Sequence, residues 1–345
     1  MTLDARIDAF SELGSLLQNY LESSDQTANF SQKLINKIRQ AEIQNAWFTP
    51  SQVNHAITAW AEILNSQNLK NWTSVYDFQV KSPKNVAIIM AGNIPLVGFH
   101  DFLSVLISGH KVLAKLSSND KVLLPFLAET LIDIQPEFKD RIRFTENKLE
   151  NFDAVIATGS NNTARYFEYY FKNKPSIIRK NRNSVAVLSG NESESELKTF
   201  GEDIFRYFGL GCRNVSKLFV PENYKFDTFF ESIFEYKTYI DHHKYANNYD
   251  YNKAVYLMSS VKLLDNNFLI LKEDSSYASP IGCLFYETYK NEEQLQNKLE
   301  SDKNKIQCKV GHFDFTETDF GESQNPSLSD YADGVDTLKF LLALN

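Results

Sequence analysis

Cysteine is scarce in this sequence of 345 residues, which contains only three, at positions 212, 283 and 308. No two of them have the C-x-x-C spacing of zinc sites and redox-active pairs. Their number is odd, whereas disulfide frameworks use paired cysteines and occur in oxidising compartments. We therefore expect free thiols and a cytoplasmic protein, with Cys283 and Cys308, which lie in apolar stretches, packed in the core.

Long apolar runs and an excess of basic residues are missing as well. No stretch of about 18 apolar residues is present, so no membrane-spanning helix is expected. The amino-terminal sequence MTLDARIDAFSELGSLLQNYL lacks a basic region followed by an apolar region, so no signal peptide is expected. The formal net charge of −8 disfavours a nucleic-acid-binding protein, whose binding surface is normally basic.

Two kinds of periodicity are present instead. Apolar residues recur at helical spacing between residues 4 and 70 and predict three helices that cover another part of the molecule. After residue 84, short apolar runs typical of strands buried on both faces alternate with helical patterns. This alternation predicts a doubly wound α/β domain that binds ligands beyond the carboxyl ends of its strands. The expected strands are 85–90, 111–116, 141–144 and 153–157.

A second α/β unit is expected from residue 184, where a further apolar strand begins, to residue 325. The chain then divides into residues 1–80, 81–183, 184–325 and 326–345. In the last segment, residues 337–344 are apolar enough to form a closing strand or an interface element.

The stretch FRYFGLGCRNVSKLFV, residues 205–220, places one cysteine in an unusual setting. Gly209 and Gly211 bracket Cys212, and glycine suits tight bends and the close approach of backbone to a ligand. A thiol at such a turn, next to Arg213, is a candidate nucleophile. A small buried core residue is the alternative, and these residues alone leave both interpretations open.

Polar residues follow three of the expected strands. Asn93 lies in a turn after the first strand, where its amide suits an oxyanion, although asparagine is also a common turn residue. Lys115 ends the second strand, where its charge reaches a cofactor's ribose or phosphate, or else extends into solvent. The turn 158–160, Thr-Gly-Ser, binds phosphate or simply caps a helix. No G-x-G-x-x-G motif supports the first of these.

In order, the segments MAGNIPL, VLAKLSS, ATGSNNTARYF and FGLGCRNVSKLFV resemble the layout of the aldehyde dehydrogenase superfamily. The similarity is greatest to its acyl-CoA reductase branch, the LuxC-type fatty acid reductases, which the C-terminal FGESQNPSLSDYADGVDTLKFL also resembles. The resemblance extends from about residue 83 to the C-terminus. It implies an aldehyde-dehydrogenase-like α/β fold, with a Rossmann-type nucleotide-binding domain at 81–183 and an α/β catalytic domain at 184–325.

The resemblance also implies a reaction and its catalytic residues. Cys212 matches the family's catalytic thiol, and Asn93 matches the asparagine whose amide helps to form the oxyanion hole. The implied activity is reduction of a long-chain acyl-CoA to the aldehyde by a nicotinamide cofactor, through a cysteine acyl-enzyme. Coenzyme A is then a leaving group rather than a bound cofactor, and no metal is implied.

The implied cofactor-binding residues lie after the second and fourth strands. Gly159 and Ser160 match the Gly-Ser pair near the cofactor's pyrophosphate, and Lys115 matches the lysine that binds the adenosine ribose, followed here by Ser117 and Ser118. Many NAD-preferring members have a glutamate at the position of Ser118. Its absence leaves room for a 2′-phosphate, so NADPH is expected, with NADH possible.

Three departures from the family pattern matter. The region 177–182, Ile-Ile-Arg-Lys-Asn-Arg, has no acid where hydrolytic members carry the glutamate that activates water. Deacylation by water is therefore disfavoured, whereas exchange with a thiol such as coenzyme A stays feasible. Ser276 replaces the glutamate that contacts the nicotinamide ribose. The length is short for the superfamily, so the oligomerisation hairpin is expected to be reduced or absent.

Two other functions stay open. One is an acyl-phosphate-using semialdehyde dehydrogenase, and the other is a non-catalytic subunit that transfers acyl groups to a partner. Expected partners are an acyl-CoA substrate and either a second copy of the chain or an acyl-transfer protein, with no nucleic acid and no integral membrane association. The adjacent His242 and His243 point in different directions on a helix or strand, so they predict no metal site.

Overall fold

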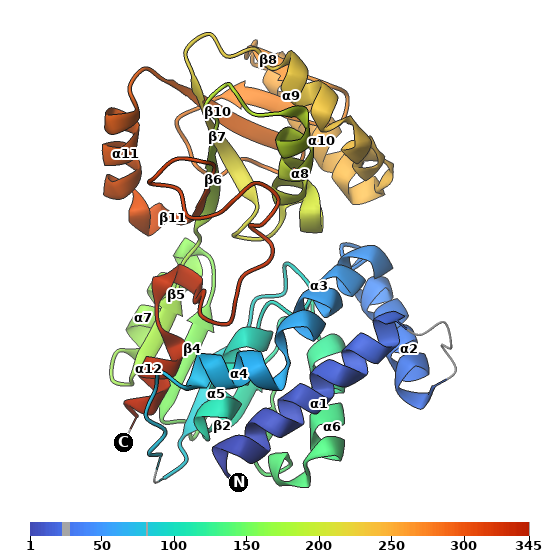
Figure 1. Ribbon diagram of the computed structural model, residues 1–345, viewed down its shortest axis with the longest axis vertical. Coiled ribbons are helices and arrows are strands. Elements are labelled where there is room, and N and C mark those ends of the chain that lie inside the picture. The colour runs from blue at the N-terminus through green and yellow to red at the C-terminus, as the bar shows by residue number, and fades with distance from the viewer. Residues whose placement is uncertain (23–27, 81, 345) are drawn as a thin grey trace. The chain divides into compact units, whose positions relative to one another are not determined.

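The computed structural model describes residues 1–22, 28–80 and 82–344. The chain forms two compact units (Figure 1). The first unit combines Met1–Lys180 with Ser327–Asn345, and the second is the continuous segment Asn181–Pro326. The helical segment at the amino terminus and the tail at the carboxyl terminus thus belong to the same unit.

The first unit contains a five-stranded parallel sheet in the order β3-β2-β1-β4-β5. The direction of strand addition reverses between β1 and β4, which makes this the topological switch point of a Rossmann-type sheet. The structure confirms the doubly wound α/β fold and adds β5, which the sequence pattern did not predict. The strands are β1 (Asn85–Ile89), β2 (Lys111–Lys115), β3 (Ile142–Phe144), β4 (Ala154–Thr158) and β5 (Ser176–Arg179).

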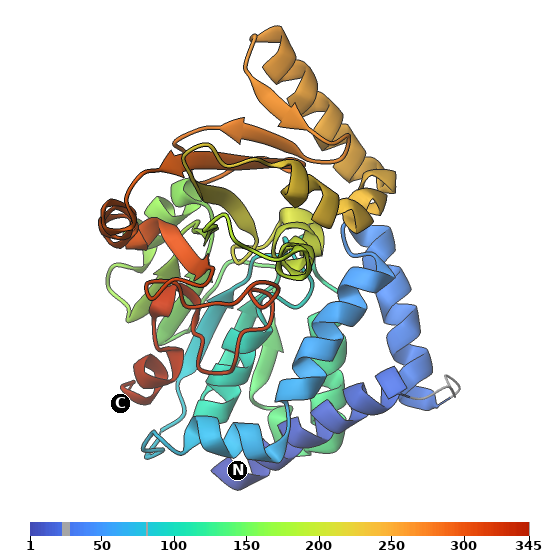
Figure 2. The same cartoon turned by 45° about the horizontal axis from the view of Figure 1, so that its top comes forward.

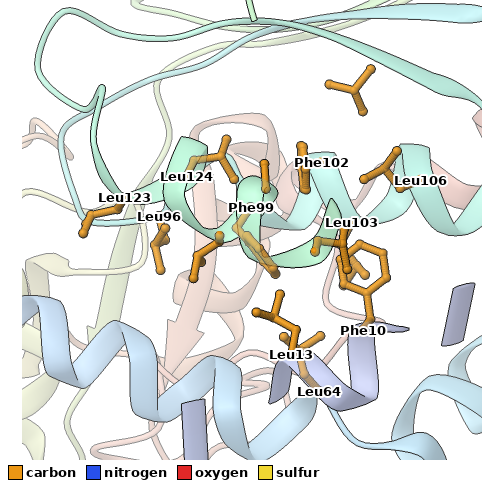
Figure 3. Packing of buried hydrophobic residues seen from close by; sticks show 14 of the residues in the cluster. Phe10, Leu13, Leu64, Leu96, Phe99, Phe102, Leu103, Leu106, Leu123 and Leu124 are labelled. Atoms are coloured by element: carbon orange, nitrogen blue, oxygen red, sulfur yellow. The ribbon is translucent and has the colours of Figure 1, made fainter. Parts of the chain in front are cut away.

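Side-chain alternation along the strands gives the sheet two buried faces. Val86 and Ile88 face the large core under the amino-terminal helices, part of which Figure 3 shows between α1, α5 and α6. Ala87 and Val155 face the opposite side, which α7 covers. Burial on both faces explains the continuous apolar runs of these strands. The helices of this part are α5 (Phe99–Ser108), α6 (Leu123–Ile134) and α7 (Asn161–Phe171), with a 3₁₀ turn η1 (Pro136–Phe138).

The amino-terminal segment contains four helices rather than the three expected, within residues 1–22 and 28–80. They are α1 (Leu3–Glu22), α2 (Asn29–Gln44), α3 (Pro50–Ile63) and α4 (Ser66–Thr73). The missed boundary lies at Asn65, whose side chain accepts the N–H of Asn68 at 2.9 Å and starts α4. Buried apolar residues continue on both sides of this cap, so the helical pattern hides the break.

The C-terminal tail forms a helix, α12 (Thr337–Leu342), where a strand or an interface element was expected. Asp336 caps it by accepting the N–H of Lys339 at 2.9 Å. Leu338 and Leu341 are fully buried and three residues apart, which is the spacing of one helix face. The expectation of a strand was wrong because a short apolar run does not distinguish a strand from a buried helix.

A buried ion pair joins three segments of the first unit. Arg179, at the end of β5, pairs with Asp101 on α5 and donates to the hydroxyl of Thr337 on α12 at 3.1 Å. Both charged side chains are at least nine-tenths buried. Arg179 is therefore a buried structural cation.

The second unit contains a six-stranded sheet in the order β11-β6-β7-β10-β9-β8, in which only β8 is antiparallel among the described strands (Figure 2). Helix α8 begins with a capping box in which Ser193 and Glu196 exchange hydrogen bonds. The strands are β6 (Asn183–Val187), β7 (Val215–Pro221), β8 (Leu263–Asp265), β9 (Ile270–Glu273), β10 (Cys283–Tyr289) and β11 (Ile306–Val310). The α-helices of this unit are α8 (Glu194–Phe205), α9 (Asp227–Ser232), α10 (His243–Met258) and α11 (Glu292–Ser301). Its 3₁₀ turns are η2 (Arg206–Gly209), η3 (Phe234–Asp241) and η4 (Lys303–Lys305). A further 3₁₀ turn, η5 (Ala332–Gly334), belongs to the C-terminal tail of the first unit.

The ion pair gives a test of the first unit's stability. Replacing Asp101 by alanine leaves the buried guanidinium of Arg179 without its carboxylate, and we expect the free energy of unfolding to fall by about 3–5 kcal/mol. Urea denaturation measures this loss. The matched control is Lys180→Ala, which removes an exposed pair with Glu168 at 2.7 Å and should cost less than about 1 kcal/mol. Equal losses for the two variants would contradict the assigned role of the pair.

Candidate functional site

Three neighbouring strands of the first unit deliver candidate residues to one edge of the sheet. In the sheet register, Ile89 of β1 lies opposite Lys115 of β2 and Ala157 of β4. Because parallel strands end at the same edge, the turns that begin after these positions are neighbours. The structure thus brings the turn of Asn93, the turn 115–118 and the pair 159–160 together at the switch point. The sequence analysis named Asn93, Lys115 and the turn 158–160 from their positions at strand ends, whereas Ser117 and Ser118 came from the family resemblance, and the binding roles of all these residues stay predictions.

The turns after β1 and β2 are in direct contact. A Cβ atom on Gly92 would lie 2.5 Å from Oγ of Ser117, so only glycine fits there. Ser117 in turn accepts the N–H of Asn119 at 3.2 Å. Burial raises the pKa of the nearby Asp120 to about 6, although backbone N–H groups, among them that of Leu96, lower it. The close packing holds the turn that carries the exposed Asn93.

The turn after β4 leads directly into helix α7. Ser160 is its N-cap, and its hydroxyl oxygen accepts the N–H of Thr163 at 3.2 Å. The interpretation of Ser160 as a helix cap is confirmed. A helix N-terminus also attracts phosphate groups, and Gly159 has no Cβ to obstruct their approach. A cofactor-binding role for the pair stays a prediction.

Lys115 is half-buried at the end of β2 and forms no ion pair with any carboxylate in the described ranges. Ser118, three residues later, carries no charge. An available cation on one strand end and a helix N-terminus two strands away are the donors that a dinucleotide's ribose and phosphates require. The residues present at this edge therefore fit a nicotinamide dinucleotide.

The three cysteines differ in exposure. Cys283 and Cys308 are buried, which confirms the expectation for both, and burial raises the pKa of each thiol to about 12. Cys212, in contrast, is exposed. The interpretation of Cys212 as a small buried core residue is therefore wrong, whereas its role as a nucleophile stays a prediction. Cys212 belongs to the second unit, whereas the strand-end residues belong to the first.

Cys212 lies in a short turn between η2 and β7. Asn214 closes this turn, because its N–H donates to the carbonyl of Gly211 at 3.1 Å while its Oδ1 accepts the N–H of Gly211 at 2.7 Å. On the other side, the hydroxyl of Ser184 on β6 donates to the carbonyl of Cys212 at 2.9 Å. The sequence analysis missed both supports. An asparagine two residues after a turn cysteine was the available signal for Asn214.

A residue whose main-chain carbonyl is hydrogen-bonded to Asn214 of this turn carries a buried carboxylate. Asp203, near the end of α8, accepts the N–H groups of Gly321 and Ser323 at 2.7 and 2.9 Å. It thereby fixes the segment FGESQ, which formed part of the resemblance. Its side chain is fully buried, and burial raises its pKa to about 6. This residue was also missed, because nothing in the pattern of α8 distinguishes it from an exposed acid.

The structure gives two further observations on the expected absences. No group of three or more His, Cys, Asp or Glu side chains is arranged to hold a metal ion in the part of the chain that the structure describes. Within the same part, no helix combines the length and the apolar character needed to cross a bilayer.

Comparison with protein families identifies the chain. The family model for acyl-CoA reductase (LuxC) matches residues 3–236, which is more than half of the sequence. The chain belongs to the LuxC acyl-CoA reductase family. The resemblance seen in the sequence is thereby confirmed. No curated protein matches this LuxC-family chain significantly.

Solved structures show that the LuxC-family chain has the aldehyde dehydrogenase fold. An indole-3-acetaldehyde dehydrogenase of P. syringae in complex with NAD+ superposes with a TM-score of 0.66 and 14% identity, covering 90% of this chain and 72% of the other. An aldehyde dehydrogenase of Physcomitrella patens with the reaction product succinate gives 0.64 and 12%, covering 90% and 73%. A Pseudomonas syringae aldehyde dehydrogenase with NAD+ and octanal gives 0.62 and 12%, covering 96% and 75%.

The rate at which Cys212 is alkylated tests whether its thiol is exposed in the folded LuxC-family protein. We expect iodoacetamide to alkylate Cys212 in the native protein at least about 100-fold faster than Cys283 or Cys308, because the buried thiols are both inaccessible and protonated. Peptide mass mapping after timed quenching measures the three rates. The control is the urea-unfolded chain, in which the three rates should converge. Equal native rates would show that Cys212 has no special environment.

The pH dependence of stability tests the burial of Asp203. Because the pKa of about 6 in the folded protein exceeds the ordinary aspartate pKa of 3.8, the contribution of Asp203 to stability is full below pH 3.8 and is lost as the pH rises through 6. Asp203→Asn removes this titration. We expect the free energy of unfolding of the variant, relative to the wild type, to rise by about 3 kcal/mol between pH 3.5 and 7. Thermal denaturation across this range is the measurement, and a pH-independent difference would contradict the burial.

Proposed function

We propose that the protein reduces an acyl-CoA thioester to the aldehyde with a nicotinamide cofactor, using Cys212 as the nucleophile. The observation that carries the proposal is the exposed Cys212 on a braced turn, in a chain of the LuxC family whose other cysteines are buried. Two of the similar structures are complexes with NAD+, which supports a nicotinamide cofactor for this chain.

In the proposed reaction, the thiolate of Cys212 attacks the carbonyl carbon of the thioester. A C–Sγ bond forms, and the carbonyl electrons move to the oxygen. A backbone N–H at the cysteine is proposed to donate to this oxyanion, and the family resemblance implies the side-chain amide of Asn93 as a second donor. Collapse breaks the bond to coenzyme A, which leaves as a thiolate and takes up a proton. Cys212 then holds the acyl group as a thioester.

When bound, a nicotinamide cofactor would supply a hydride, which is a proton with two electrons, for reduction of the acyl carbon on Cys212. The reduced intermediate on Cys212 is a thiohemiacetal oxyanion, whose electrons re-form the C=O bond as the C–Sγ bond breaks, so that the aldehyde leaves and the thiolate of Cys212 returns. Lys115, Ser117 and Ser118 are proposed to bind the adenosine ribose, and Gly159 and Ser160 the pyrophosphate. Without a negative charge at Ser118, a 2′-phosphate is tolerated, so we propose NADPH as the preferred form.

Release of the acyl group by water is disfavoured in this proposal. The stretch 177–182 carries no carboxylate, and its one buried charge, that of Arg179, is a cation paired with Asp101. No base is therefore supplied from this stretch to activate water on the acyl-enzyme. The acyl group is retained until it is reduced or returned to a thiol.

Oxidation of NADPH in the presence of butyryl-, octanoyl- and palmitoyl-CoA tests the proposal. We expect acyl-CoA-dependent loss of NADPH absorbance in the wild type, slower oxidation with NADH, and loss of activity by at least about 1,000-fold in Cys212→Ala, because the nucleophile is gone. Cys283→Ala is the matched control, since it removes a buried cysteine, and should keep its rate within about threefold.

Other outcomes discriminate the alternatives. If intact-protein mass spectrometry shows acylated Cys212 but NADPH is not oxidised, the result favours an acyl-transfer subunit. Activity with an acyl phosphate but with no acyl-CoA favours a semialdehyde dehydrogenase. If Cys212 is not acylated and no substrate is turned over with any of these compounds, the proposed function is contradicted.

A further inference from the structure

The backbone before Cys212 is held in an unfavourable conformation. Tyr207, Phe208 and Gly209 have φ of +53°, +57° and +74°, so that three consecutive residues are left-handed. For a residue with a Cβ this conformation costs roughly 1–2 kcal/mol. Such strain persists only where the surroundings enforce it, and it tends to occur at functional sites. Some group must therefore restrain this segment.

Aromatic packing of Phe208 against Tyr239 and His242 is one restraint, and the side chain of Asn214 is the one that reaches the main chain on both sides of the segment. Its Nδ2 donates to the carbonyl oxygens of Arg206 at 2.8 Å and Asp203 at 3.2 Å, and its Oδ1 accepts the N–H of Gly211 at 2.7 Å. The bonds to Arg206 and Gly211 lie on either side of the strained segment 207–209. One amide thus fastens both ends of the left-handed segment.

The same amide also completes the end of helix α8. The last carbonyl groups of a helix have no partner within the helix. Asp203 and Arg206 supply two such carbonyls, and Asn214 satisfies both with its two amide hydrogens. The amide is buried, with 3% of the residue exposed, so water is a poor substitute for it. Losing these bonds would leave polar groups without partners beneath the cysteine turn.

The far side of the turn is fixed independently. Ser184 donates to the carbonyl of Cys212 at 2.9 Å, and its own oxygen lies 2.9 Å from Sγ of Cys308. Cys212 is therefore held from β6 through its carbonyl and from α8 through Asn214. Only the second of these restraints passes through the strained segment.

We propose that Asn214 is a positioning residue for the reaction of Cys212: it holds the strained 207–209 segment so that the thiol and its backbone are placed to attack the thioester. This inference rests on the proposed function. The residue contacts no reacting atom, and it acts through the turn 211–214. A misplacement of the nucleophile by about 1 Å costs a reaction about 100-fold, whereas the exposure of the thiol changes little.

The test compares two reactions of the same thiol. Acylation of Cys212 by octanoyl-CoA, followed by rapid quench and intact mass, depends on the placement of the thiol. Alkylation by iodoacetamide needs only an accessible thiolate. The ratio of the two rates cancels changes in thiol ionisation, because both reactions use the thiolate. We expect this ratio to fall about 10- to 100-fold in Asn214→Ala, with kcat falling in parallel and KM for NADPH unchanged.

Asn214→Asp is the second variant, because it keeps the size and the acceptor for Gly211 but turns an oxygen towards the carbonyls of Asp203 and Arg206. Its ratio should fall about tenfold or more as well. Asn252→Ala is the matched control. Its amide donates to the carbonyl of Ile281 at 3.0 Å in the same unit, and its loss should leave the ratio unchanged.

The outcomes separate the two proposals. A wild-type ratio in both Asn214 variants, in a protein whose wild type turns over acyl-CoA, overturns the positioning role and leaves the proposed function standing. A wild type that is neither acylated nor active overturns the proposed function and this inference with it. Rapid alkylation of Cys283 and Cys308 in both variants indicates unfolding and overturns positioning in favour of a purely structural role.

Discussion

The first unit depends on a charge that is buried and cannot be neutralised. The guanidinium of Arg179 stays protonated, so once β5 is buried its end must find an anion inside the protein. Asp101 provides it from α5, and Thr337 of α12 adds a neutral acceptor. Burial of the ion pair gives little net stability, but leaving either partner alone is costly. The pair thus selects one arrangement of β5, α5 and α12 and fastens the tail to the sheet that carries the strand-end residues.

The sequence predicted most of the sheet, because strands buried on both faces leave continuous apolar runs between polar turns. It predicted the strand-end residues for a related reason, since parallel strands end at a common edge. It did not predict β5, whose SIIR ends in a charge, nor the helix at 337–342, since short apolar runs are ambiguous. The helix and strand preferences of single residues carry no information on ion pairs such as Arg179 and Asp101. The two residues are far apart in the sequence and meet only through tertiary packing.

For the turn of Cys212, too, the sequence predicted some features and only the structure shows the others. Glycine spacing and the family resemblance singled out the cysteine, yet the residues alone left its burial open. The exposure of Cys212 and the burial of Cys283 and Cys308 are properties of the folded chain. The supports of the turn, Asn214 and Ser184, are ordinary residues by type. Their importance lies in hydrogen bonds to main-chain groups that no local pattern encodes, and such bonds follow from the paths of α8 and β6.

The division of the chain also has a consequence for synthesis. The second unit is one continuous segment, whereas the first closes only when residues 327–345 are added to residues 1–180. On the ribosome, domains fold as they emerge, starting from the amino terminus. The second unit therefore has all of its strands while the first still lacks α12. During that interval the face of α5 that packs Leu338 and Leu341 is open, and the Arg179–Asp101 pair is without Thr337. The nascent first unit thus exposes this apolar surface until the last residues of the chain have been synthesised.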